Sequence, residues 1–150
     1  MKIGKKLAGI LLALCLLLSL LPMAALAAPA APEGIWTDYA ADAFAGGSGT
    51  EEDPYQIATP EQLAKLAADV NTGVVNLSHS GEHFILTADL NLSAHRWIPI
   101  GTGTRNASFH SWYGYFDGNN KTITGLYVDE SKEKFTAGLF GNFGGETIKN

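Results

Sequence analysis

One segment of the chain has the apolar spacing of an α-helix, with apolar residues three and four positions apart on a shared face. The set consists of Leu63, Leu66, Ala67 and Val70. Thr59 precedes it as an N-cap, Pro60 takes the first helical position, and Gln62 completes a capping box. Gly73 follows, and helices commonly end at a glycine. The pattern predicts a short helix that must pack against other elements to be stable.

Beyond this helix, short apolar runs alternate with turns, which is typical of β-strands. The runs are HFILTADLNL at 83–92, RWIPIG at 96–101, KTITGLYV at 121–128 and AGLFGNF at 137–143. The glycine-rich segment at 44–54 is predicted to be a loop. No residue after Gly73 follows a helical period, so we expect an all-β fold with one helix.

A segment near the end of the sequence resembles an earlier one. Gly114 and Phe116 correspond to Gly138 and Phe140 at a spacing of about 24 residues. A Thr-Ile pair recurs at nearly the same spacing, at 122–123 and 147–148. The strands of a β-sandwich need not share a sequence motif. The stacked coils of a solenoid, in contrast, must place similar residues at the same inward positions in each turn. The recurrence therefore favours a solenoid.

The first residues have the three parts of a secretory signal peptide. Three lysines at positions 2, 5 and 6 precede an apolar run from Leu7 to Leu21, and Ala25-Leu26-Ala27 fits the small-residue cleavage rule. We predict a signal peptide at 1–27, cut between Ala27 and Ala28. A membrane anchor is the alternative, but the run is short for a span and breaks at Pro22. Residues 28–48 are expected to form a spacer and lead-in.

Charge and cysteine content narrow the possible partners. Removing 27 of the 150 residues would leave 123 without a cysteine, so no disulfide could stabilise the exported chain. Loss of the signal's lysines would also take the formal charge from −5 to about −8. This acidic balance argues against nucleic acid and against insertion into membranes after signal removal. It is compatible with neutral glycans, with cations or with no ligand.

The order of motifs also carries a family resemblance. The segments GTEEDPYQIATPEQLAKLAADVN, FILTADLNLS, WIPIGT, GYFDGNNKTITGLYV and AGLFG resemble the N-terminal part of bacterial cell-surface proteins that bear the GLUG motif. The Gly-Leu-apolar-Gly signature of that motif is Gly138, Leu139, Phe140 and Gly141. The resemblance covers 49–150 and implies a right-handed parallel β-helix, entered through a capping helix, on a secreted or cell-wall-associated protein.

The resemblance also implies that the β-helix is incomplete. One full signature is present, and the sequence stops where the family usually continues with another strand. We therefore expect 49–150 to hold the capping helix and the first coils of a longer protein. If the chain does end at Asn150, self-association would have to cover the open coil edge.

Aromatic residues supply the candidate binding site. They are Trp97, Trp112, Tyr113 and Tyr115. Exposed aromatic rings can stack on sugar rings, so a glycan-binding face is the functional hypothesis. The alternative is that these rings fill or cover the core around Phe116, as aromatic residues usually do.

No metal or cofactor is expected. His79, Glu82 and His83 lie close in sequence but do not form the His-Glu-x-x-His pattern of zinc peptidases. The segment DGNNKT at 117–122 lacks the spaced acidic series of a calcium loop and is better explained as a turn.

The leading hypothesis is an exported, non-catalytic β-solenoid module that serves as an adhesive region or a stalk. Its expected partners are host or environmental glycans or surface proteins. A polysaccharide lyase or hydrolase is the enzyme alternative, with Asp89, Asp117 and Asp129 as candidate carboxylates. A third hypothesis is the N-terminal region of a surface metallopeptidase whose catalytic domain lies beyond residue 150.

Overall fold

The computed structural model describes residues 30–72, 79–102, 110–129, 137–145 and 147–150. The second of the chain's two compact units, Ala31–Asn150, contains every element discussed below. The predicted signal peptide at 1–27 and its cleavage site between Ala27 and Ala28 lie outside the described residues. Within the described ranges, no helix has the length and apolar character needed to cross a membrane.

The described elements form a small mixed α/β unit. A 3₁₀-helix comes first, η1 (Trp36–Tyr39), and the α-helix is α2 (Pro60–Thr72). The strands are β1 (Tyr55–Ile57), β2 (His83–Leu86), β3 (Leu90–Asn91), β4 (Tyr115–Asp117), β5 (Ile123–Thr124) and β6 (Thr147–Lys149). Four strands form a parallel sheet in the order β1-β2-β4-β6, and β3 pairs with β5 in a second parallel sheet.

The predicted all-β class and the right-handed parallel β-helix are therefore wrong. The described residues form one α-helix and parallel sheets of four and two strands, without an evident solenoid. The recurrence near 24 residues does not set the strand pairing. Phe116 pairs with Ile148, whereas its sequence counterpart Phe140 forms an isolated bridge with Ile100. A short glycine-aromatic pattern is thus used in two different structural settings.

Helix α2 begins as the sequence predicts. The Gln62 backbone N–H donates to the Thr59 hydroxyl over 3.3 Å, and the Gln62 side-chain oxygen accepts from the Thr59 N–H over 3.2 Å. These reciprocal bonds are the predicted capping box, which satisfies backbone donors that have no partner within a helix. The buried residues of α2 are Leu63, Ala64, Leu66, Ala67 and Val70. The apolar spacing therefore identified the packed face correctly.

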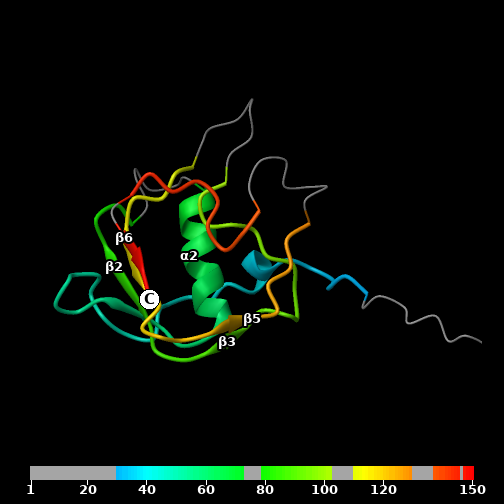
Figure 1. Ribbon diagram of the computed structural model, residues 1–150, viewed down its shortest axis with the longest axis horizontal. Helices are drawn as coiled ribbons and strands as arrows, with labels where there is room; N and C mark the ends of the chain where they lie inside the picture. The colour runs from blue at the N-terminus through cyan, green and yellow to red at the C-terminus, as the bar shows by residue number, and fades with distance from the viewer. Residues whose placement is uncertain (1–29, 73–78, 103–109, 130–136, 146) are drawn as a thin grey trace, which may run out of the picture. The chain divides into compact units, whose positions relative to one another are not determined.

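The core lies between α2 and the inner face of the larger sheet. Figure 1 shows α2 beside this sheet, with the β3–β5 pair below them in that view. Phe84 and Leu86 from β2 and Phe116 from β4 are buried in one apolar cluster with the helix residues. The alternate positions of these strands remain partly exposed, as expected for a strand with one buried face. The outer face of the sheet is thereby left available for contacts.

Candidate functional site

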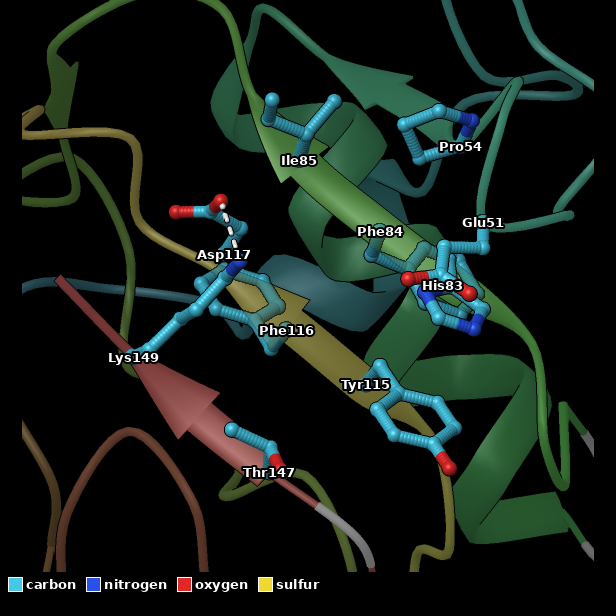
Figure 2. Close-up of a pocket in the computed structure, with 10 residues that line it drawn as sticks. All are labelled: Glu51, Pro54, His83, Phe84, Ile85, Tyr115, Phe116, Asp117, Thr147 and Lys149. Atoms are coloured by element: carbon cyan, nitrogen blue, oxygen red, sulfur yellow. Dashed lines mark ion pairs between the residues drawn. The ribbon is translucent and has the colours of Figure 1, made fainter.

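A pocket of about 530 Å³ lies over the outer face of the four-stranded sheet (Figure 2). Its walls come from three neighbouring strands and from the loop before β1. The lining residues are Glu51, Pro54, His83, Phe84, Ile85, Tyr115, Phe116, Asp117, Thr147 and Lys149. The pocket therefore combines aromatic, charged and hydroxyl side chains.

Strand register sets which side chains meet in this pocket. In β2, His83 and Ile85 face outward because Phe84 and Leu86 are buried. The parallel pairing places Tyr115 beside His83 and Thr147 beside Tyr115. One residue pair further along, Asp117 lies beside Ile85 and Lys149 beside Asp117. The outer face thus has an aromatic end and a charged end.

A stacked ring pair forms the aromatic end. The His83 and Tyr115 rings are nearly parallel, at 9°, with their centroids 4.1 Å apart. Neighbouring strands lie about 4.8 Å apart, so two planar side chains in register can stack directly. Figure 2 shows both rings at the same end of the pocket, where Glu51 also projects. The pair offers a flat, partly exposed surface to a ligand.

Asp117 and Lys149 form the charged end. A carboxylate oxygen of Asp117 lies 3.2 Å from Lys149 Nζ, and the other accepts hydrogen bonds from the Asn119 N–H and the Asn150 side-chain amide, each 2.8 Å long. The bonds from Asn150, Asn119 and Lys149 favour the charged form and lower the pKa of Asp117 despite slight desolvation. Asp117 is therefore an ionised hydrogen-bond acceptor at neutral pH.

Two of the predicted aromatic residues belong to the core. Trp97 and Trp112 are both 0 % exposed, so neither can offer a ring face to a sugar. The Trp97 indole donates to the Leu139 carbonyl over 3.0 Å, and Trp112 stacks on Phe140 with ring centroids 5.4 Å apart. The structural alternative for these residues is the correct one, because large aromatic rings bury more apolar area than other side chains.

The two predicted tyrosines differ in position. Tyr115 lines the pocket, whereas Tyr113 does not. Tyr113 is 39 % exposed but packs over neighbouring glycines: a Cβ added at Gly144 would lie 2.7 Å from its ring. Tyr113 therefore covers a glycine-rich segment, and Tyr115 is the predicted glycan-stacking residue that the pocket includes.

The Gly138–Gly141 signature lies away from the pocket lining. Its Phe140 forms a parallel bridge with Ile100, and the Ile100 N–H donates to the Leu139 carbonyl over 3.0 Å. The Gly141 N–H in turn donates to the Ile100 carbonyl over 2.8 Å. Leu139 and Phe140 are partly buried against the core. The backbone bonds of the signature thus attach the segment at 138–141 to the core at Ile100.

The carboxylates considered for catalysis have separate partners. Asp89 accepts from the Thr122 N–H over 2.8 Å, and Asp129 pairs with Arg96 over 3.6 Å. Asp117 is the member of this set that lines the pocket. Among the described residues, no three histidine, cysteine or acidic side chains are grouped so that they could hold a metal ion.

Sequence reasoning missed His83 as a partner of Tyr115. It considered His83 with His79, but the structure separates their roles: His79 bonds Asp69 and Glu82, whereas His83 stacks on Tyr115. Alternation in His83–Leu86 could have placed His83 on the outer face. The sequence contains no comparable signal for the register that brings Tyr115 beside it.

Comparison with known proteins gives two partial matches. The chain is 34 % identical over 107 residues to a predicted Gly-rich membrane protein of Evansella cellulosilytica, covering 67 % of this chain and 11 % of the relative. It is 37 % identical over 90 residues to halomucin of Haloquadratum walsbyi, covering 57 % of this chain and 1 % of that protein. No protein-family description matches the chain. No solved structure matches it either.

Proposed function

We propose that this chain is an exported, non-catalytic module of a surface protein and that it adheres to carbohydrate. The observation that carries the proposal is the stacked His83–Tyr115 pair within a pocket that also contains charged and hydroxyl groups. Binding sites commonly combine a flat aromatic surface with a few polar groups that fix orientation. A sugar ring has both an apolar C–H face and hydroxyl groups, so it suits both ends of this pocket.

The relatives support the location. One is named as a membrane protein and the other as halomucin, which is consistent with a surface or membrane-associated protein. The finer proposal is a secreted or cell-wall-associated protein, and it rests on the predicted signal peptide at 1–27. The chain spans only 11 % and 1 % of the length of these relatives. The proposal therefore takes from them only the location that their names indicate.

Membership of the GLUG-bearing surface proteins stays a prediction based on the Gly138–Gly141 signature. The lyase or hydrolase alternative loses its main argument, because it relied on a β-helix that the described residues do not form. The metallopeptidase hypothesis places its catalytic residues outside this sequence and stays a hypothesis. A stalk role needs no ligand and is the second candidate function.

Retention on insoluble polysaccharides tests the adhesive function. The full chain would be incubated with cellulose, chitin, insoluble β-1,3-glucan and peptidoglycan, and the bound fraction measured after washing. We expect retention on at least one polymer, without release of reducing ends or unsaturated products. The double variant His83→Ala/Tyr115→Ala should lose this retention while remaining folded.

A matched control exists in the same chain. Tyr39 stacks on His95 with centroids 4.0 Å apart and the same 9° angle, but neither residue lines the pocket. The double variant Tyr39→Ala/His95→Ala should therefore be retained like the wild type. Absence of wild-type retention on every polymer would remove the adhesive function and leave the stalk. Release of sugar products, abolished by Asp117→Asn, would instead establish the enzyme.

A further inference from the structure

A charged cluster joins helix α2 to the turn before strand β2. His79 Nε2 lies 3.0 Å from a carboxylate oxygen of Asp69, and its Nδ1 contacts a carboxylate oxygen of Glu82. Asp69 also pairs with Lys65, one helical turn earlier, over 3.0 Å. Both ring nitrogens of His79 therefore face acidic side chains.

This arrangement favours a doubly protonated ring. An ionised carboxylate can only accept hydrogen bonds, and a neutral imidazole carries one N–H. A neutral His79 could donate to Asp69 or to Glu82, and its other nitrogen would direct a lone pair at a carboxylate. The imidazolium form can donate to both. The pKa of His79 is accordingly raised: burial of the ring opposes the charge, but the bonds to Asp69 and Glu82 outweigh that effect.

Apolar rings pack against His79, whereas the side chains of Asp69 and Glu82 remain 30 % and 37 % exposed. The His79 ring meets Phe44, Tyr55 and Phe84 edge-on, with centroids 5.9, 6.1 and 5.2 Å away. The titratable or charged groups facing it are Asp69 and Lys65 from α2, Glu82 from its own turn, and Tyr55 from β1. The rings exclude water from the His79 side of the cluster and so strengthen its ion pairs relative to those of a fully solvated histidine. His79 also has φ near +60°, which its contacts must offset.

The turn that carries His79 is bonded directly to the pocket. The Glu82 carbonyl accepts from the Tyr115 N–H over 2.9 Å, and the next residue is His83. The His83 N–H donates to the Gly49 carbonyl over 2.9 Å, in the loop that carries Glu51. One end of the pocket, with both stacked rings, is therefore attached to the segment that His79 anchors.

We propose that His79 is a positioning residue for this pocket: its imidazolium clamps α2 to the turn before β2 and so holds the His83–Tyr115 pair in its binding arrangement. The proposal rests on the carbohydrate-binding function proposed above. When the ring loses its second proton, one of the two carboxylates is released. The clamp is thus complete at lower pH and weakens as the pH rises through the titration of His79.

The first test measures affinity against pH. A soluble neutral β-1,3-glucan would be titrated into the full chain by calorimetry between about pH 5.5 and pH 9, a range that brackets the ordinary imidazole titration. We expect wild-type affinity to fall at least about fivefold across this range. His79→Gln should bind more weakly at low pH and show little further change.

A remote histidine provides the control. His95 donates to the Glu33 carbonyl over 2.9 Å and stacks on Tyr39, without lining the pocket. His95→Gln should reproduce the wild-type pH profile. A wild-type affinity that does not change with pH, or a His79→Gln profile identical to that of the wild type, would overturn the clamp.

The second test needs no ligand. Nitrogen-15 resonances of the His79 ring, followed by NMR during a pH titration of the full chain, report how many protons the ring carries. We expect both nitrogens to stay protonated above the pH at which an ordinary imidazole loses one, with Tyr115 ring resonances changing at the same midpoint. The clamp would be refuted if His79 lost a proton at the pH of an ordinary imidazole. It would also be refuted if the Tyr115 ring resonances did not change at the His79 midpoint. Failure to bind the soluble glucan and each of the four insoluble polysaccharides at any pH would instead contradict the proposed function.

Discussion

Among the described residues, two tyrosine–histidine pairs stack with almost the same geometry but have different surroundings. The Tyr115 and His83 rings are 4.1 Å apart and the Tyr39 and His95 rings 4.0 Å apart, both at 9°. The first pair spans two neighbouring strands and lines a pocket with charged and hydroxyl groups. The second joins η1 to the segment before Trp97.

The second pair serves to attach a segment to the core. Its His95 meets the buried ring of Trp36 edge-on at 4.9 Å and donates to the Glu33 carbonyl. These contacts hold η1 against the core, and neither ring of the pair lines the pocket over the sheet. Stacked rings alone therefore do not define a binding site. The neighbouring polar groups, and the strand register that supplies them, distinguish the first pair from the second.

Removing the support of the second pair should have the largest effect on stability. Trp36 is 4 % exposed, and its indole donates to the Leu92 carbonyl over 2.9 Å. Trp36→Ala should lower the free energy of unfolding by about 3–5 kcal/mol, because it leaves a large cavity. Urea denaturation followed by circular dichroism measures this change. The folded fraction of this variant should still bind glucan with wild-type affinity. A loss of affinity would contradict the claim that the His83–Tyr115 pair binds independently of the Tyr39–His95 pair.

Acid should weaken the segment beside the first pair. Burial opposes the charge on Asp69, but bonds from His79 and Lys65 lower its pKa overall. Its stabilising contribution is present above the ordinary aspartate value and is lost as the pH falls through the lowered pKa. Asp69→Asn should cost about 1.5–3 kcal/mol near pH 6. Denaturation curves from pH 2 to pH 6 should show a smaller acid dependence in this variant, and unchanged dependence would contradict the assignment.

Loss of the α2 cap should have a moderate effect that leaves binding intact. Thr59→Ala removes the hydroxyl that accepts from the Gln62 N–H. We expect a loss of about 1 kcal/mol in the free energy of unfolding. Glucan affinity should not change in the folded protein, because Thr59 contributes no group to the pocket. Equilibrium denaturation and calorimetry at one pH check both statements.

The charged end of the pocket should contribute least to stability. The Lys149 side chain is 61 % exposed, so its pair with Asp117 is well solvated. Lys149→Ala should change the free energy of unfolding by less than about 0.5 kcal/mol. If Lys149 orients the ligand, affinity should nevertheless fall by a few-fold. A stability loss much larger than this would show that the ion pair has a structural role.

The local signals that predicted α2 were read correctly, but the apolar runs at 96–101 and 137–143 form isolated bridges instead of the predicted strands, and the long-range pairing was missed. The start of α2 and its buried face follow from residues three and four apart, together with Thr59 and Gln62. Strand pairing instead joins distant residues, as when Leu90 of β3 pairs with Ile123 of β5. Strands of two to four residues carry too few positions to specify partners at that distance.

The candidate site was predictable only in part. Tyr115 was identified as an aromatic candidate, but the burial of Trp97 and Trp112 depends on tertiary packing that composition does not reveal. The recurrence of a glycine and a phenylalanine near 114–116 and 138–140 suggested a structural period. Phe116 and Phe140 instead pair with unrelated partners, Ile148 and Ile100. Similar short motifs can arise wherever a glycine allows close packing beside an aromatic ring.

NMR mapping of the two ring pairs tests the central claim most directly. Ring resonances of His83, Tyr115, Tyr39 and His95 would be followed in the full chain while a soluble neutral β-1,3-glucan is added. The account predicts that His83 and Tyr115 shift in a saturable manner while Tyr39 and His95 do not. Equal shifts in both pairs, or shifts confined to Tyr39 and His95, would contradict the claim that the outer face of the sheet is the binding site.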